Sequence, residues 1–284
     1  MTNNTSALFS IPTNPTTTTQ RWSMQFPYNL PLPRDYKNDP ILLNLLSNCL
    51  RLSSNNFTKD NLPTLPEHIF NAYNVSSSSS ASAATSTSTI ASSSFILPSI
   101  DLLQEWIYQI YYNVRTKKLI IHLYDQYYPL LALFQPDTNK LGQINQSNYV
   151  NNQRITGISI TVKYPSTVPS NNHQNQNIDF ASRYFSPWNG ISEDPVNGSS
   201  HTLLGPYWCN ILNRFTDTKN NENALLQRKG TVIGYQQSSR TGILYINVQE
   251  TRTNETDITS VDDANNFVML GGYAVTISSG KLVL

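Results

Sequence analysis

The residues best suited to chemistry lie in one stretch, EDPVNGSSHTLLGPYW, which spans residues 193–208. Two carboxylates, Glu193 and Asp194, precede a proline turn, a glycine, two serines and an apolar segment. A carboxyl group beside a bound carboxylate in partly dry surroundings has a raised pKa and can carry a proton. The start of a buried helix presents free amides that attract anions. The stretch therefore predicts a proton-transfer site for an acidic small molecule.

A purely structural role also accounts for these residues. An aspartate shortly before a helix is usually a turn or capping residue, and paired serines usually cap a helix. His201, in the first turn, would be kept neutral by the helix dipole and could donate to a ligand. A histidine satisfied by its own fold suits that position equally. The residues by themselves leave both alternatives open.

The element that must position this site is a helix within residues 198–215, GSSHTLLGPYWCNILNRF. Ser199 or Ser200 suits its N-cap position. Its apolar side chains cover too much of the surface for a helix with one side in water, which is typical of a buried helix. These side chains are Leu203, Leu204, Tyr207, Trp208, Ile211, Leu212 and Phe215. Pro206 removes one backbone hydrogen bond, so a kink or a later start is expected.

Short strands dominate the rest of the chain. Residues 40–52 show helical spacing of apolar side chains, 102–114 fit either a helix or a strand, and 130–146 end in a helical or irregular segment. Strands are predicted at 22–26, 118–124, 154–163, 178–187, 231–235, 242–249, 267–270 and 273–277. Many short strands with one or two core helices predict an α+β domain with a strongly curved sheet.

Two segments are expected to carry no regular structure. Residues 1–20 are polar, rich in Thr and Asn and without periodicity, which predicts a disordered tail. Residues 76–94 are almost entirely Ser, Ala and Thr, too small to offset the entropy of ordering. This tract is therefore expected to be a flexible insertion in a surface loop.

Composition narrows the classes of partner. The net charge is +1 and only 13% of residues are charged, so nothing electrostatic favours nucleic acid or an anionic membrane. No apolar run approaches the ~20 residues that cross a bilayer, and no secretion signal is found at the N-terminus. The expectation is a cytoplasmic protein in which Cys49 and Cys209 are reduced thiols. No nucleotide motif and no paired histidines occur, so neither a metal nor another cofactor is expected.

One long segment resembles a known family. DFASRYFSPWNGISEDPVNGSSHTLLGPYW, residues 179–208, is similar to the signature of phenazine-biosynthesis-like (PhzF-type) proteins, roughly DF-SR-FAPW-GI-EDPVTGSAH-LAPYW. Flanking segments such as KKLIIHLYDQYYPLLALFQPDTNKL and GGYAVTISSGKL resemble the family's strands. WSMQFPYNLPLP resembles the strand that links the family's two lobes. The resemblance covers residues 21–284.

The resemblance implies a diaminopimelate-epimerase-like fold, in which each of two lobes wraps a curved sheet, or barrel, round a central helix. It also implies cofactor-independent isomerisation by proton transfer on small carboxylated substrates. Asp194 matches the catalytic position of the second lobe, and Gly198, Ser199 and His201 match the motif that binds substrate.

The domain organisation follows from the same comparison. Residues 21–33 match the remnant of the linking strand, and residues 34–284 match a second lobe interrupted by the Ser-rich insertion. The family's first-lobe glutamate, in a pattern like N-x-SETAF, has no counterpart in this chain. Only one complete lobe is therefore expected.

Two functions remain open on these grounds. The first is an isomerase whose acid–base pair is completed by a partner chain, either a separate first-lobe chain or a second copy in a homodimer, or by a first lobe encoded upstream of this sequence. The second is a catalytically inactive member of the family that binds a ligand or another protein, since fold alone does not guarantee chemistry.

Overall fold

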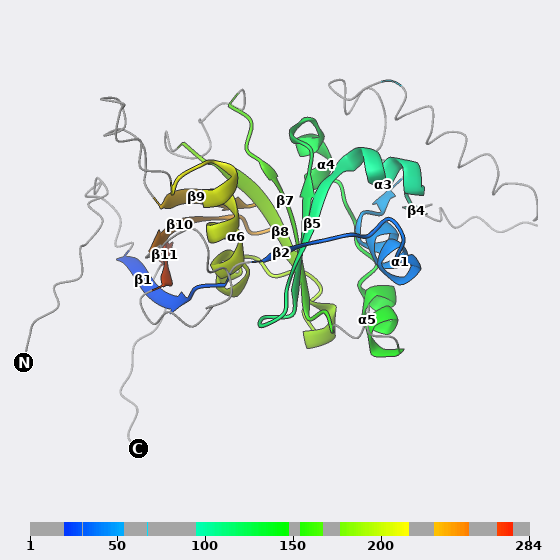
Figure 1. The fold of residues 1–284 in the computed structure, drawn as a ribbon, viewed down its shortest axis with the longest axis horizontal. Helices are drawn as coiled ribbons and strands as arrows, with labels where there is room; N and C mark the ends of the chain where they lie inside the picture. The colour runs from blue at the N-terminus through cyan, green and yellow to red at the C-terminus, as the bar shows by residue number, and fades with distance from the viewer. Residues whose placement is uncertain are drawn as a thin grey trace, which may run out of the picture.

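The computed structural model describes residues 20–29, 31–53, 67, 95–147, 154–166, 177–215, 230–249 and 266–274 (Figure 1). The predicted polar tail, apart from Gln20, and the predicted insertion at 76–94 lie outside these residues. The described part is a mixed α+β structure, as the sequence predicts.

The described strands form a nine-stranded sheet in the order β1-β11-β10-β9-β8-β7-β6-β5-β2. Their bounds are β1 Gln20–Pro27, β2 Leu32–Arg34, β5 Ile107–Asn113, β6 Lys118–Leu123, β7 Gly157–Lys163, β8 Phe180–Phe185, β9 Thr231–Gln236, β10 Gly242–Gln249 and β11 Phe267–Ala274. The pairs β6–β7 and β8–β9 are parallel, and the other neighbours are antiparallel. Two short strands, β3 Leu52–Ser53 and β4 Phe95–Ile96, pair separately.

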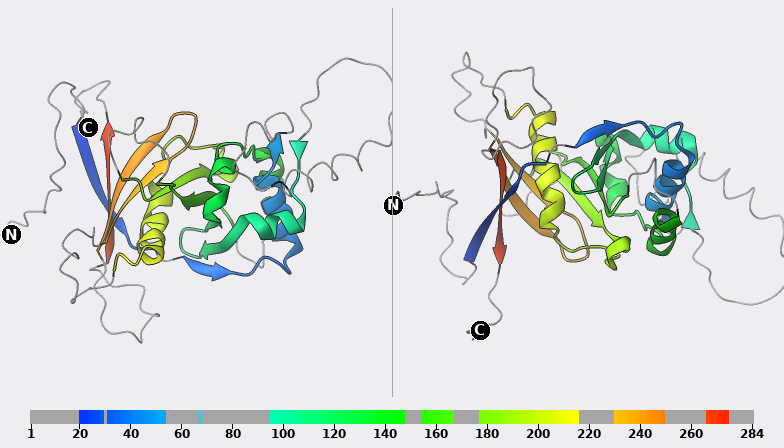
Figure 2. Two further views of the ribbon diagram at one scale, coloured as in Figure 1. Left: turned by 90° about the horizontal axis from the view of Figure 1, so that it is seen from above. Right: turned by 60° about the horizontal axis from the view of Figure 1, so that its bottom comes forward.

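The helices divide into two groups. One group consists of α1 Pro40–Cys49, α3 Ile100–Trp106, α4 Tyr128–Leu131 and α5 Thr138–Ser147, together with the short 3-10 turn η1 Asp125–Tyr127. Seen from above, α1, α3 and α5 lie together at the end of the molecule far from β1 and β11 (Figure 2). The other group is α6 Gly198–Ile211 with the 3-10 turn η3 Pro187–Asn189 before it.

The sheet is forced to curve by its own connections. Strands β1 and β2 follow one another in the chain but occupy opposite edges of the sheet. Residues 28–31 alone join them, and a link of that length spans at most about 18 Å. A flat sheet of this order would separate its edges by about 38 Å, at about 4.8 Å per strand. The sheet therefore curls, and β1, β11, β10 and β9 surround α6 (Figure 1).

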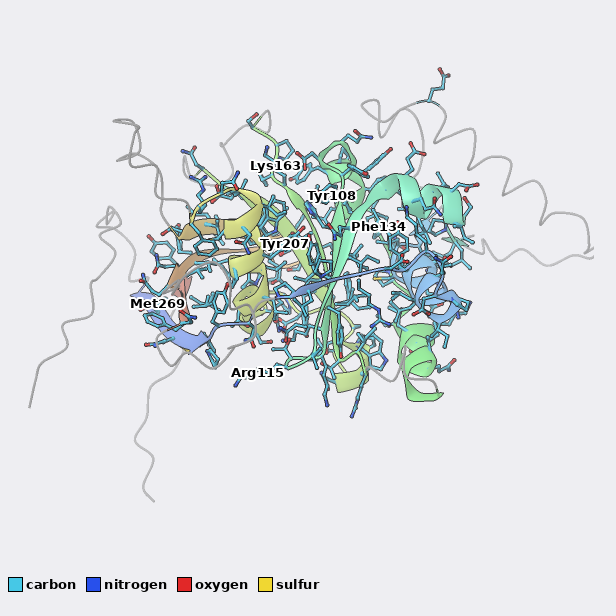
Figure 3. The ribbon with its side chains drawn as sticks, viewed as in Figure 1. Tyr108, Arg115, Phe134, Lys163, Tyr207 and Met269 are labelled. Atoms are coloured by element: carbon cyan, nitrogen blue, oxygen red, sulfur yellow. The ribbon has the colours of Figure 1, made fainter. Side chains whose placement is uncertain are left out.

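The two faces of the central strands build two separate cores. Because successive side chains point to opposite faces of a strand, Ile120 and Phe180 pack against α6, while Leu119 and Ile121 pack against the first group of helices. Figure 3 shows Phe134 on the side of that first group and Tyr207 on α6. The central strands are thus covered on both faces.

Helix α6 is buried almost throughout, as its apolar pattern predicts. Every residue from 200 to 209 is buried, and the indole Nε1 of Trp208 donates to the Thr161 hydroxyl on β7 at 3.0 Å. The helix begins at Gly198 and continues through Pro206, so of the two alternatives the later start is wrong, and the kink stays a prediction. Contacts on all sides hold the helix across the missing backbone donor.

Several other segments differ from the predicted bounds. Residues 102–114 contain both alternatives, because helix α3 ends at Trp106 and strand β5 begins at Ile107. The predicted helix at 40–52 ends at Cys49. Two strands are predicted on either side of the two glycines, at 267–270 and 273–277, but the structure has one strand there, β11. Its pairing with β1 continues through both glycines. Residues 275–277 lie outside the described part.

Cys49 and Cys209 are both buried free thiols, which confirms the prediction of reduced cysteines. Among the described residues, no helix has the length and apolar character that a bilayer crossing requires.

Packing around α6 gives a test with an internal control. A Cβ atom at Gly205 would lie 2.5 Å from a methyl carbon of Ile246 on β10, whereas one at Gly142 in α5 would meet nothing within 4 Å. Gly205→Ala is expected to lower the free energy of unfolding by about 1–3 kcal/mol through overpacking. Gly142→Ala should raise it by up to about 1 kcal/mol through helix propensity. Urea denaturation of both variants measures the difference, and equal shifts in one direction would contradict the close packing of α6.

Candidate functional site

The start of α6 is capped by Asn197 rather than by a serine. The Asn197 side-chain oxygen accepts a hydrogen bond from the Ser200 amide at 2.6 Å. The Ser200 hydroxyl instead donates to the Asn197 carbonyl at 3.0 Å, and Ser199 is exposed. In the described part of the chain, the amides of Gly198 and Ser199 have no acceptor. The helix therefore keeps two free donors at an end that solvent reaches.

Asp194 lies beside this helix start, as the sequence predicts. One carboxylate oxygen accepts from the Val196 amide at 3.2 Å, and the other accepts from the Asn197 side-chain amide at 2.8 Å. The side chain is half-buried. Asn197 thus bonds both to the helix amide and to the catalytic candidate, which fixes Asp194 relative to α6.

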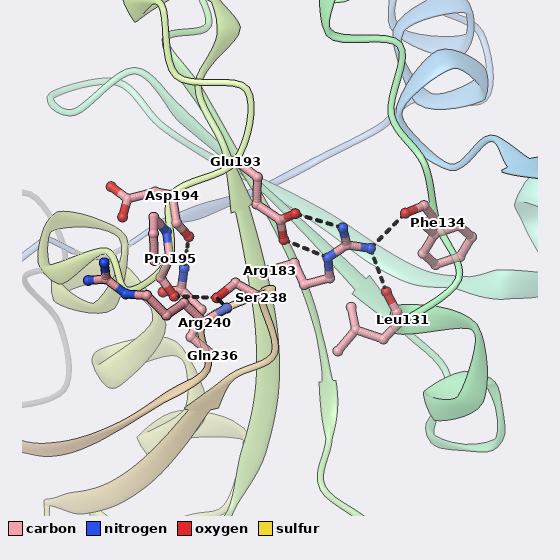
Figure 4. A network of polar contacts seen from close by, with 9 residues as sticks. All are labelled: Leu131, Phe134, Arg183, Glu193, Asp194, Pro195, Gln236, Ser238 and Arg240. Carbon is pink, nitrogen blue, oxygen red and sulfur yellow. Dashed lines mark hydrogen bonds and ion pairs between the residues drawn. The ribbon is translucent and has the colours of Figure 1, made fainter.

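Glu193 does not share that end of the helix, contrary to the expectation that both acids line it. Its two carboxylate oxygens accept from Arg183 on β8 at 2.7 and 2.9 Å. The same guanidinium donates to the carbonyls of Leu131 and Phe134 at 3.0 and 2.7 Å. Figure 4 shows Glu193 and Asp194 pointing in opposite directions from adjacent positions. Glu193 anchors the loop, and Asp194 alone faces the helix start.

Gln236, at the end of β9, holds this loop from the other side. Its fully buried side chain accepts from the Asn197 amide at 2.8 Å and donates to the Asp194 carbonyl at 2.5 Å. Ser238 adds a bond from its hydroxyl to the Pro195 carbonyl at 2.7 Å (Figure 4). The backbone that carries Asp194 is thus fixed to strands β8 and β9.

A lysine that the sequence interpretation missed completes the cluster. Lys118, the first residue of β6, donates from its ammonium group to the Ser199 hydroxyl. Its side chain passes over the ring of Tyr184, with the nitrogen 5.4 Å from the ring centroid. Burial lowers the pKa of Lys118 to about 8, against a smaller opposing effect of the Asp194 charge. Strand alternation could have identified it, because Lys118 shares the face of Ile120.

Tyr184 reaches this position because Gly157 has no side chain. A Cβ atom at Gly157 on β7 would overlap the Tyr184 phenol. Burial raises the pKa of Tyr184, so the phenol stays protonated at neutral pH. Tyr184 therefore forms a neutral wall beside the Lys118 ammonium group.

The polar groups form one hydrogen-bonded series. Lys118 donates to Ser199, the Ser199 hydroxyl donates to the Asn197 side-chain oxygen at 3.0 Å, and Asn197 donates to Asp194. A cation and a carboxylate are thereby held at the same helix end with a hydroxyl and an amide between them.

His201 lies in the interior rather than at the open end. Its side chain is fully buried, with Nδ1 2.6 Å from the Asn197 carbonyl and the ring stacked near Phe180. Burial lowers the pKa of His201 to about 4, so the ring is neutral at pH 7. This geometry favours the structural alternative for His201, and its role in substrate binding stays a prediction.

Gly198 lies in the first turn beside the free amides. A Cβ atom there would make only an ordinary contact, 3.8 Å from Leu270, so packing within the chain does not require glycine. Among the described residues, no cluster of three potential metal-ligating side chains occurs.

This arrangement can bind an anion and move a proton. The free amides and the Lys118 ammonium group attract a carboxylate, while Asp194 can accept or donate a proton at an atom of the bound molecule.

A protein-family model and several curated proteins match this sequence. The family model described as phenazine biosynthesis-like protein matches residues 85–280. A phenazine biosynthesis-like domain-containing protein of Bos taurus is 36% identical over 104 residues, which are 36% of this chain and 33% of that protein. An uncharacterized isomerase of Halalkalibacterium halodurans is 35% identical over 128 residues, which are 45% of this chain and 34% of that protein. The matches thus span about a third of these curated relatives.

Two solved structures are also similar. A putative PhzC/PhzF protein from Clostridium difficile aligns over 93% of this chain and 58% of its own, with a TM-score of 0.47 and 20% identity. A PhzF-family protein from Enterococcus faecalis aligns over 66% of this chain and 52% of its own, with a TM-score of 0.40 and 26% identity.

The ion pair that anchors the loop should contribute strongly to stability. Arg183→Met leaves the Glu193 carboxylate and two carbonyls without their donor, and we expect a loss of about 2–4 kcal/mol in the free energy of unfolding. Lys163→Met removes a pair with Asp125 that is 3.9 Å long and largely exposed, so a change below about 1 kcal/mol is expected. Urea denaturation compares the two, and a neutral Arg183→Met would show that the loop is held by other contacts.

Buried neutral histidines predict acid sensitivity. Burial lowers the pKa values of His201 and His122 to about 4, whereas unfolded histidine titrates near 6.5. The unfolded chain therefore binds more protons between these values, and the free energy of unfolding falls as pH drops from about 6.5 to 4, by up to about 3 kcal/mol per histidine.

NMR titration of the two imidazole rings checks this expectation. The His122→Asn and His201→Asn variants assign the signals. A ring with a midpoint near 6.5 would contradict its burial.

Proposed function

This chain belongs to the phenazine biosynthesis-like family, and on that premise we propose that it acts in cofactor-independent isomerisation of a small carboxylated molecule. Asp194 carries one of the two proton transfers, at one carbon of the substrate, and a second acid–base group carries the other. The amides of Gly198 and Ser199 hold the substrate carboxylate. Two distant relatives carry the name uncharacterized isomerase, which supports this class of reaction.

The observation that carries the proposal is the position of Asp194 beside free amides. Asn197 caps the helix through its oxygen and bonds Asp194 through its nitrogen, so the acid–base group and the anion-binding end have a fixed separation. Such positioning lowers the entropic part of a proton-transfer barrier. His201 supports the helix start from inside.

The proposal includes the diaminopimelate-epimerase-like fold, with one complete lobe in this chain. The curvature of the sheet round α6 and the family membership support it. The first-lobe surface would come from another chain or from sequence that precedes these residues in a longer protein, and it would cover Ser199 at the helix start, which is open to solvent here. Such a surface would exclude water and supply the second acid–base group.

Exchange of carbon-bound hydrogen tests the proposal. A panel of unsaturated small carboxylic acids is incubated with the protein in D₂O, and deuterium incorporation is followed by NMR. Asp194→Asn should lower the exchange rate by at least about 100-fold, the usual contribution of a positioned acid or base. Folding should be retained, because asparagine still accepts from the Val196 amide.

Asp125→Asn is the matched control, since Asp125 is exposed and its carboxylate lies in the weak pair with Lys163. It should exchange at the wild-type rate. Wild-type exchange by Asp194→Asn would remove Asp194 from the mechanism. Binding of these acids without any exchange by the wild-type protein would support the alternative of an inactive binding member of the family.

A further inference from the structure

Lys118 is a buried cation without a matching anion. Only 8% of the residue is exposed. Among the described residues, no carboxylate lies within ion-pair distance of its nitrogen, and its bonded partner is the uncharged Ser199 hydroxyl. Buried charges in proteins are normally paired, because the loss of hydration is otherwise uncompensated.

The groups that face Lys118 do not supply this compensation. Asp194, in the loop before α6, acts on it only at longer range and is already bonded to Asn197 and Val196. His201 on α6 is neutral at pH 7, and Tyr184 on β8 presents a ring and a protonated phenol. The ammonium group therefore has hydrogen-bonding capacity left over.

The position of the Lys118 ammonium group indicates which kind of ligand could accept its remaining hydrogen bonds. Lys118 reaches from the first residue of β6 to Ser199, which is exposed and directly adjoins the free amides of α6. Two neutral donors and one cation thus converge on one end of the helix from two different elements. A negatively charged ligand that only accepts hydrogen bonds would satisfy both amides and the ammonium group.

We propose that Lys118 is the counter-ion of the substrate carboxylate and makes the site selective for acids over uncharged analogues. This inference rests on the proposed function and adds a residue that the family resemblance did not assign. Lys118 is a binding and positioning residue that orients the carboxylate, while Asp194 acts on a carbon atom of the same molecule. An uncharged amide in place of the carboxylate would leave the buried ammonium group unpaired and so bind poorly.

Binding measurements on a matched pair of probes test this inference. The protein is titrated with benzoate and with benzamide, followed by NMR shifts of backbone amides and by calorimetry. The wild-type protein should bind benzoate more tightly than benzamide. Lys118→Met, which is similar in length, should weaken benzoate binding about 10- to 100-fold, as expected for a charged hydrogen bond, and leave benzamide binding unchanged.

Two further variants control for charge and for folding. Lys163→Met removes an exposed lysine at the last residue of β7, whereas Lys118 is the first residue of the parallel neighbour β6 (Figure 3 labels Lys163). This variant should bind benzoate as the wild type does. Lys118→Arg keeps the charge and should retain part of the affinity for benzoate. Equal loss in both Lys118 variants would indicate a structural role and overturn the inference.

A measurement on the wild-type protein alone avoids any question of folding. Because the pKa of Lys118 is about 8, pairing with an anion should raise it and cause proton uptake on benzoate binding between about pH 8 and 9. Calorimetry in two buffers of different ionisation enthalpy counts these protons. Absence of proton uptake, or failure of the wild type to bind benzoate, would overturn the assignment of Lys118.

The two proposals can fail separately. If Lys118→Met binds benzoate normally while Asp194→Asn loses deuterium exchange, Lys118 is not the counter-ion and the proposed isomerisation stands. If Asp194→Asn exchanges normally while Lys118→Met loses benzoate binding, the anion site stands and the proposed catalytic role does not.

Discussion

Helix α6 has no water-facing side between residues 200 and 209, and this constraint determines much of the rest of the structure. A helix that is buried all round must be enclosed, so the sheet curls until the short link between β1 and β2 can join its two edges. Enclosure leaves the helix ends as the places where backbone groups still need partners. The N-terminal end is only partly satisfied by Asn197, so the unfilled amides are a direct result of how the helix is packed.

The same enclosure brings distant parts of the chain to that end. The inward face of the sheet supplies Lys118 from β6 and Tyr184 from β8, while Gln236 fixes the loop from β9. Each comes from a strand that also contributes to a core, so the polar groups have rigid supports. The Arg183–Glu193 pair lies on the outward side of β8 and holds the loop without occupying the site. One face of β8 thus carries the arginine that holds the loop, and the other face carries the Tyr184 ring that lines the site.

Local pattern was sufficient to predict the central elements and Asp194, but not the contacts that depend on strand order. The apolar run after Gly198 predicted a buried helix, and β7 and β8 were found at nearly their true bounds. The sequence predicts a serine cap because Ser and Asn have similar capping preferences, and only the turn geometry selects Asn197. The direction of Glu193 depends on Arg183 lying on the outward face of β8. The contact of Lys118 with Ser199 could not be predicted, because it depends on how α6 packs on the sheet, 81 positions further along the chain.

The contact between Gly157 and Tyr184 constrains which residues can occupy these two positions together. The phenol occupies the volume that any side chain at position 157 would need. In proteins that share this strand arrangement, these two positions should therefore co-vary, with a large residue at one accompanied by a small residue at the other. A substitution at position 157 alone would displace the aromatic ring from its place beside the Lys118 ammonium group. Sequence change at position 157 is therefore limited by a side chain of the neighbouring site.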